Sequence, residues 1–270
     1  MNDTLSAHIN VRVYCTPRFF WLTSWLIVAL ALTGCAQLPT PASSSPPTIT
    51  TTASVTGATD VFAPPNNPAD PAWRGVNIRF KTPTEYSLRE IDGRACIRAV
   101  ANAAWSFWVA DVPAALAKAT TLSWRWNVPA LIPDADNLVP GKDDSPARIV
   151  VAFKGDRSKL DAADRSTMSL AKALGGVELP FAAIQYIWEG KAPPETIAPN
   201  SNTSRIQKLI VKSGGAGLAM WQSFTRDVRA DFRRAFPGEE PGDIESVGLM
   251  TDTDGLGGTA EACYADIELR

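Results

Sequence analysis

The chain has 270 residues and a nearly balanced charge, with 26 lysines and arginines against 28 aspartates and glutamates and a formal net charge of −2. This balance, without any basic stripe, argues against nucleic acid as a partner. The single histidine is His8. Histidine-based triads, general bases and metal ligands are therefore excluded from residue 9 onward.

The first 34 residues are typical of an export signal. Arg12 and Arg18 precede an apolar run from Phe19 to Leu32, which is shorter than the roughly 20 residues that span a bilayer. The run ends in Leu32-Thr33-Gly34-Cys35, which resembles the lipobox of bacterial lipoproteins. The resemblance implies cleavage before Cys35 and attachment of diacylglycerol to its thiol. The alternative is an ordinary signal peptide with a chance cysteine.

Residues 35–72 are expected to tether the folded part of the chain to a membrane through the lipid on Cys35. The second mature residue is Ala36, whereas lipoproteins retained in the inner membrane typically carry aspartate there. We therefore expect an outer-membrane lipoprotein that faces the periplasm. From Ala36 to Thr59 no residue is charged and Pro, Ser, Thr and Ala dominate, a composition that cannot offset the entropy of ordering.

Residues 73–270 are long enough for one domain, and their pattern is mainly that of strands and turns. A hairpin is predicted about Asp92-Gly93. The alternation in Thr121–Val128 places Trp124 and Trp126 on one apolar face, which predicts that both are core residues. Further strands are predicted at 148–153, 183–188, 205–211, 217–224, 246–251 and 262–269, and helices at 158–174 and 227–236. This spacing predicts a mostly β fold, an antiparallel β-sandwich of jelly-roll type with one or two peripheral helices.

Five segments, in this order and spacing, carry a family resemblance. They are Leu122–Val128 with Lys142–Phe153, Asp227–Phe236, Met250–Asp254 and Tyr264–Ile267. Together they resemble the bacterial family catalogued as domain of unknown function 3047, over nearly all of residues 73–270. The resemblance implies an exported domain without an established activity. The closing pattern of Asp-x-Asp-Gly and a final strand is also similar to jelly-roll carbohydrate-binding modules.

Cys96 and Cys263 depart from the usual pattern of that family. They are the only cysteines after residue 35, and the expected compartment is oxidising, so we predict a disulfide between them. The strand alternation leaves open whether the two side chains face each other.

Two tryptophans are candidates for a platform on which a sugar ring could stack. Trp221 has small same-face neighbours, and Trp108 lies opposite Phe107 and Val109 in the alternation. Core packing is the alternative for both. Gln222 and Arg226 are the polar neighbours expected to bind sugar hydroxyls. The function favoured by this pattern is non-catalytic binding of an envelope or extracellular glycan.

Aspartates gather in two turn-rich regions, which makes calcium the one cofactor that we consider. Calcium takes six to eight oxygen ligands, and the candidates are Asp252, Asp254, Asp266, Asp143 and Asp144. The alternative is that these residues form turns. No catalytic residue is predicted. Two further functions stay open, a structural or protein-interaction lipoprotein and a hydrolase that uses carboxylates without histidine.

Overall fold

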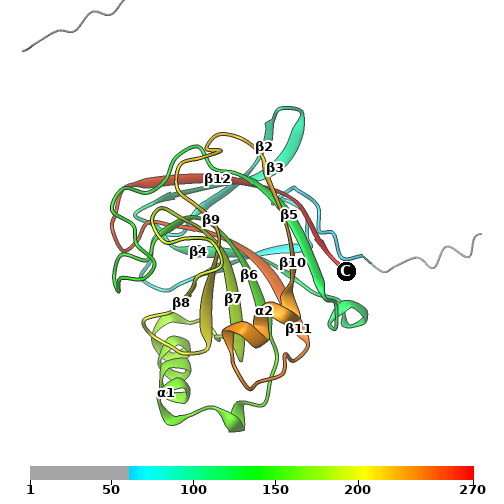
Figure 1. Ribbon diagram of the computed structural model, residues 1–270, viewed down its shortest axis with the longest axis vertical. Helices are drawn as coiled ribbons and strands as arrows, with labels where there is room; N and C mark the ends of the chain where they lie inside the picture. Colours follow the sequence, from blue (N-terminus) through cyan, green and yellow to red (C-terminus); the bar gives the residue numbers. More distant parts are fainter. Residues whose placement is uncertain (1–60) are drawn as a thin grey trace, which may run out of the picture. The chain divides into compact units, whose positions relative to one another are not determined.

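The computed structural model describes residues 61–270, so Cys35 and the signal segment lie outside the described residues. This part of the chain is a sandwich of two mostly antiparallel β-sheets with two α-helices (Figure 1), which confirms the predicted mostly β, jelly-roll-type fold. Neither helix is both long and apolar enough to span a bilayer.

The larger sheet has seven strands in the order β1-β4-β11-β6-β7-β9-β8, and only the β7–β9 pair is parallel. Its strands are β1 (Trp73–Asn77), β4 (Ser106–Asp111), β6 (Ser145–Phe153), β7 (Ala182–Glu189), β8 (Ile197–Pro199), β9 (Ile206–Ser213) and β11 (Ile244–Asp252).

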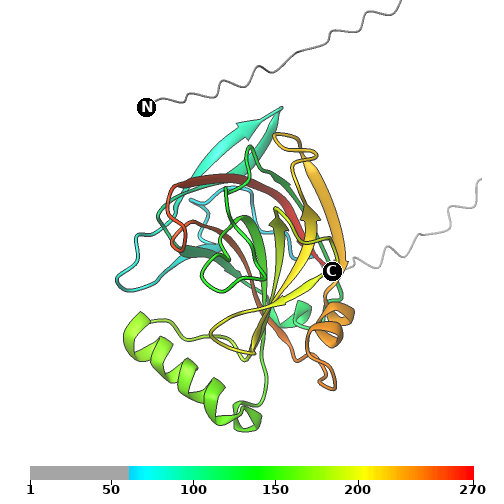
Figure 2. The same cartoon turned by 60° about the vertical axis from the view of Figure 1, so that its left-hand side comes forward.

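The smaller sheet has five antiparallel strands in the order β10-β5-β12-β3-β2. Its strands are β2 (Glu85–Ile91), β3 (Arg94–Asn102), β5 (Thr121–Asn127), β10 (Gln222–Asp227) and β12 (Thr259–Leu269). Figure 2 shows β12, drawn in red, running across this layer with β7 and β9 in the other.

Two helices, α1 (Ala162–Leu170) and α2 (Val228–Ala235), lie where helices were predicted. Asp227 caps α2 by accepting hydrogen bonds from the backbone N–H groups of Arg229 and Ala230 at 3.0 and 2.9 Å, which satisfies two otherwise unpaired donors. The apolar side of α2 faces the sandwich, because Phe232 packs on Phe153 at 4.9 Å between ring centroids.

The core lies between the sheets and is rich in aromatic rings. Trp124 and Trp126 are fully buried, as predicted. Trp124 stacks on Tyr186 of the opposite sheet at 5.2 Å between centroids and on Phe224 at 5.3 Å. These contacts fix which face of β5, β7 and β10 points inward.

The predicted hairpin about Asp92-Gly93 is confirmed, since Ile91 pairs with Arg94 and both turn residues have positive φ. The strand predicted at 217–224 begins later, because Gly217 and Ala219 adopt positive φ in a turn before β10. β1, β4 and β8 were not predicted.

The outer face of the seven-stranded sheet is also buried, although a two-layer sandwich needs only its inner face covered. The segment between β5 and β6, residues 128–144, lies against this face: the backbone N–H of Asn137 donates to the carboxylate of Glu189 at the end of β7, and Asp143 pairs with Lys208 of β9. Polar side chains are thereby enclosed outside the aromatic core.

Candidate functional site

The two predicted disulfide cysteines are brought together on the outer face of the five-stranded sheet. Cys96 of β3 and Cys263 of β12 form a disulfide with their Cα atoms 5.6 Å apart, and both are buried. Adjacent antiparallel strands place diagonal neighbours of one face within reach of each other. The two side chains therefore share a face, which the sequence left open.

Trp221 covers this disulfide. Its ring packs against Cys96, Cys263 and Ala265, and its Nε1–H donates to the carbonyl of Ile91 at 3.3 Å. The guanidinium of Arg94 lies over the ring, 5.6 Å from its centroid. Trp221 is thus outward-facing and half-buried, but its ring is not a bare platform.

Gln222 and Arg226 do not lie on the same face as Trp221. Both lie on the inward face of β10 with Phe224, because side chains alternate along a strand. Arg226 binds Asp231 and Glu195 and lies over the Tyr186 ring. Its hydrogen bonds to Glu195 lower the pKa of that carboxyl to about 2.

Trp108 is also not placed as a stacking platform. It lies on the core side of β4, where it stacks on Tyr86 at 5.2 Å between centroids. A Cβ atom on Gly75 of β1 would come within 2.9 Å of its ring. Trp108 is therefore packed in the core, which was the alternative to a stacking platform.

Beside Trp221 the outer face of the five-stranded sheet is hollowed. The hollow has a volume of about 250 Å³ and is lined by Ser123, Trp124, Arg125, Ser223, Phe224, Thr225, Asp266 and Glu268. Arg125 donates to the Ser223 hydroxyl at 3.0 Å and pairs with Asp266 at 3.2 Å. We call this surface the outer hollow. It presents hydroxyls, a guanidinium and carboxylates together.

Sequence reasoning missed these residues, although one signal was available. Ser223 and Thr225 follow Trp221 at steps of two, so strand alternation places all three on one face. The cross-strand partner of Ser223 is Arg125 of β5, and that register cannot be read from the pattern.

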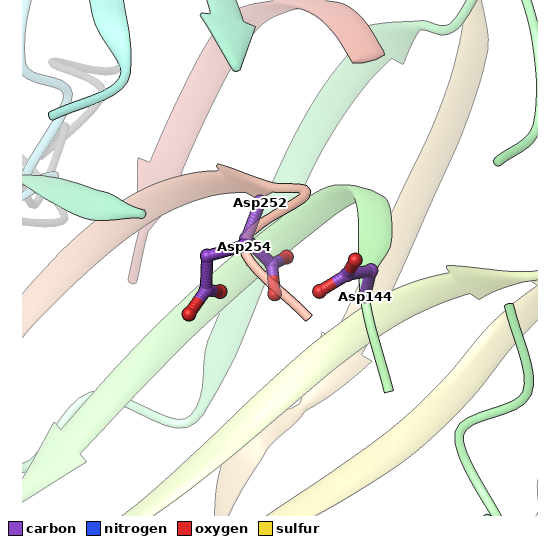
Figure 3. Close-up of side chains that lie close together, drawn as sticks. All are labelled: Asp144, Asp252 and Asp254. Atoms are coloured by element: carbon purple, nitrogen blue, oxygen red, sulfur yellow. The ribbon is translucent and has the colours of Figure 1, made fainter. Parts of the chain in front are cut away.

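Of the predicted metal ligands, three gather. Asp144, Asp252 and Asp254 each offer an oxygen within 4.8 Å of the others (Figure 3), from the segment before β6 and the end of β11 with its following turn. Asp266 is not among them, because it lies at a bulge of β12 and pairs with Arg94 and Arg125. Asp143 instead pairs with Lys208 at 3.0 Å.

Each of the three gathered carboxylates already has a partner within residues 61–270. Asp144 accepts from the backbone N–H groups of Gly255 and Leu256, and Asp254 pairs with Lys81 at 2.7 Å. Asp252 binds Arg148. A calcium ion would have to displace Lys81 from Asp254 and Arg148 from Asp252 before these carboxylates could bind it. The geometry therefore favours the alternative of structural aspartates, of which Asp144 holds a turn and Asp252 forms an ion pair.

Arg148 is the centre of a group on the outer face of the seven-stranded sheet. We call Arg148, Gln185, Lys208 and Asp252 the buried polar cluster, since each is at most 5% exposed. The Arg148 Nε and Nη2 donate to the two oxygens of Asp252 at 2.8 and 2.9 Å, and Nη1 donates to Gln185 at 2.9 Å.

Burial has opposite consequences for the two kinds of ionisable group in this cluster. It raises the pKa of Asp252 to about 6, although the Arg148 guanidinium opposes the shift, so the carboxyl is still mostly ionised at neutral pH. Burial also lowers the pKa of Lys208, and the nearby Arg148 charge acts in the same direction. The cluster is thus a pair of buried cations held by Asp252 and Asp143.

Solved structures with a similar fold come from proteins that bind or cut polysaccharides. A family 11 carbohydrate-binding module of Clostridium thermocellum is 10% identical, with a TM-score of 0.39 over 78% of this chain and 95% of that one. The xyloglucanase domain of NopAA from Sinorhizobium fredii is 8% identical, with a TM-score of 0.38 over 78% and 96%. The family GH12 endoglucanase 3 of Trichoderma harzianum is 6% identical, with a TM-score of 0.37 over 78% and 94%.

No curated protein matches this sequence. A family model does match, over residues 71–268, which include both sheets and both helices from Trp73 onward. The segments that carried the resemblance supply Asp143, Asp144, Arg148, Asp252 and Asp254, which the fold brings to one face of the seven-stranded sheet. The chain belongs to the family described as protein of unknown function, DUF3047.

Proposed function

We propose that this protein is an outer-membrane lipoprotein facing the periplasm, and that its sandwich domain binds a glycan without cutting it. The outer hollow is the observation that carries the binding part of the proposal. Sugars present many hydroxyls, and the hollow offers donors and acceptors of matching kinds at Ser123, Arg125, Ser223, Thr225 and Asp266.

The surroundings of the outer hollow support a sugar rather than an apolar ligand. Its lining side chains are polar except for Trp124 and Phe224, whose rings point into the core. Trp221 lies on the same face two residues before Ser223, next to the residues that line the hollow. Polar groups beside an aromatic ring are the usual means of orienting a ligand that has both apolar C–H and hydroxyl groups.

Binding is favoured over hydrolysis because the carboxylates of the hollow are already engaged. Asp266 pairs with Arg94 and Arg125, and Glu268 pairs with Arg270. Glycoside hydrolysis needs one carboxyl to give a proton and another to attack or to activate water. In the outer hollow both carboxylates are instead paired with arginines. Release of reducing ends from a bound glycan would nevertheless favour the hydrolase alternative.

The binding proposal is tested with the purified full chain in detergent on an array of envelope and extracellular glycans. We expect binding, and we expect Ser223→Tyr to weaken it at least about tenfold because the tyrosine ring fills the hollow. Ser87→Tyr is the matched control, since Ser87 is exposed on the far edge strand of the same sheet. If no glycan on the array were bound, a structural or protein-interaction role would be favoured over glycan binding.

The anchoring proposal predicts that Cys35→Ala releases the protein from the membrane fraction. The reason is that the lipid on this thiol is the only attachment proposed. Mass spectrometry of the mature N-terminal peptide should find it beginning at Cys35 with a diacylglycerol adduct. Membrane attachment that survives Cys35→Ala, or an unmodified peptide with another start, contradicts lipidation.

A further inference from the structure

A small pocket lies beside the buried polar cluster, on the opposite sheet from the outer hollow. Its volume is about 90 Å³, the space of about three water molecules. It is lined by Asn137, Leu138, Val139, Pro140, Asp143, Pro199, Asn200, Ser201 and Lys208. We call it the loop pocket, because residues 137–143 form one wall and residues 199–201 form another.

One residue that lines the loop pocket, Asn137, has an unused hydrogen-bond acceptor. Asn137 is 3% exposed, and its side-chain Oδ1 has no hydrogen-bond partner within residues 61–270. Its Nδ2 donates to the carbonyl of Asp144 at 3.3 Å, which fixes the orientation of the amide because a carbonyl can only accept. A buried acceptor left without a donor is costly, so an N–H or O–H group that reached Asn137 Oδ1 from the pocket would be stabilising.

The same pocket contains unused donors. Lys208 is 1% exposed, and among the described residues its Nζ donates only to Asp143, at 3.0 Å. An ammonium group has three N–H donors. The remaining donors need acceptor atoms, and the pocket is the space that Lys208 lines.

The rim of the pocket is apolar. Leu138 and Val139 are 52% and 41% exposed, which is high for large aliphatic side chains, and Pro140 and Pro199 lie beside them. A group that fits must therefore be a few non-hydrogen atoms in size, with one donor, one acceptor and an apolar part.

We propose that the loop pocket binds the acetamido group of an N-acetylated amino sugar. The acetamido carbonyl accepts from the Lys208 ammonium, its N–H donates to Asn137 Oδ1, and its methyl group contacts Leu138 and Val139. The pocket itself specifies only the acetamido group. The choice of a sugar as its carrier rests on the proposed glycan-binding function, whose hollow lies on the other sheet.

The test compares two neutral β-1,4-linked oligosaccharides that differ at one substituent, the tetramer of N-acetylglucosamine and cellotetraose. Titration calorimetry on the purified full chain in detergent should give at least tenfold tighter binding of the N-acetylated tetramer. Ser201→Phe should remove this preference by filling the exposed mouth of the pocket. Asn202→Phe is the control, because Asn202 is the exposed neighbour in the same loop but does not line the pocket. Lys208→Met should also remove the preference, provided that its circular dichroism spectrum matches the parent.

The outcomes separate this inference from the proposed function. Equal affinity for the two tetramers contradicts the acetamido assignment and leaves glycan binding standing. A preference that survives Ser201→Phe contradicts the loop pocket as its location. If an acetyl-lysine peptide bound more tightly than the N-acetylated tetramer, the acetamido group that the pocket binds would not belong to a sugar. An absence of binding to either tetramer, with an array that binds nothing, contradicts both proposals.

Discussion

Removing the Cys96–Cys263 disulfide is expected to lower the free energy of unfolding by about 5 kcal/mol, from the loop-closure entropy of a 167-residue separation. Without the bond the unfolded chain gains conformational entropy, whereas the folded chain gains almost none. The bond also joins β3 to β12, which are neighbours in the five-stranded sheet, so the native pairing itself should survive in the variant.

The measurement is urea-induced unfolding of the parent and of the Cys96→Ala/Cys263→Ala double variant, each with and without a reductant. The parent should lose stability on reduction, and the double variant should not respond. Two free thiols in the unreduced native parent, shown by thiol labelling, would rule out the bond. A loss below about 1 kcal/mol would show that the reduced unfolded state keeps structure that offsets the entropy gain.

Arg148→Ala is expected to cost about 3–5 kcal/mol, because it leaves the Asp252 carboxylate buried without its partner. The arginine donates to Asp252, Gln185 and the carbonyl of Asp143, so its loss orphans acceptors on three segments at once. Asp252→Asn should also be strongly destabilising, since it leaves the guanidinium without a counter-charge. The double variant should lose less than the sum of the two, because neither charge is then buried alone.

Urea unfolding measures these losses in free energy, provided that parent and variants show the same dependence of the unfolding free energy on urea concentration. The control is Arg74→Ala. Arg74 also pairs with an aspartate, Asp111, at 2.7 Å, but both side chains are more than half exposed. Such a surface pair contributes about 0–1 kcal/mol. If Arg148→Ala and Arg74→Ala had similar effects, the cluster would be far more hydrated than its burial indicates.

The sequence predicted what depends on local pattern. The Asp92-Gly93 hairpin, the inward Trp124 and Trp126, and the capped helix after Asp227 all follow from turn chemistry or periodicity. The same alternation should have separated Trp221 from Gln222 and Arg226, which are one and five positions away and so on the opposite face.

The rest of the candidate site depends on register between distant strands. Asp252 of β11 pairs with Ser145 of β6, 107 residues earlier in the chain, and this places Asp252 beside Arg148. Nothing local to either strand specifies that alignment. The covering of the outer sheet face by residues 128–144 was missed for the same reason, and with it the roles of Lys208 and Asn137.

The order of strands in the two sheets has a consequence for how the domain forms. β11 and β12 follow every other strand in the chain, yet each lies in the interior of its sheet, β11 between β4 and β6, and β12 between β3 and β5. As the chain emerges from its amino end, β4 and β6 each lack one neighbour until β11 is available, and β3 and β5 each lack one until β12 is available. Such late, long-range closure makes folding slow and leaves strand edges open to aggregation in the meantime. We therefore expect the two sheets to close only when β11 and β12 are both available.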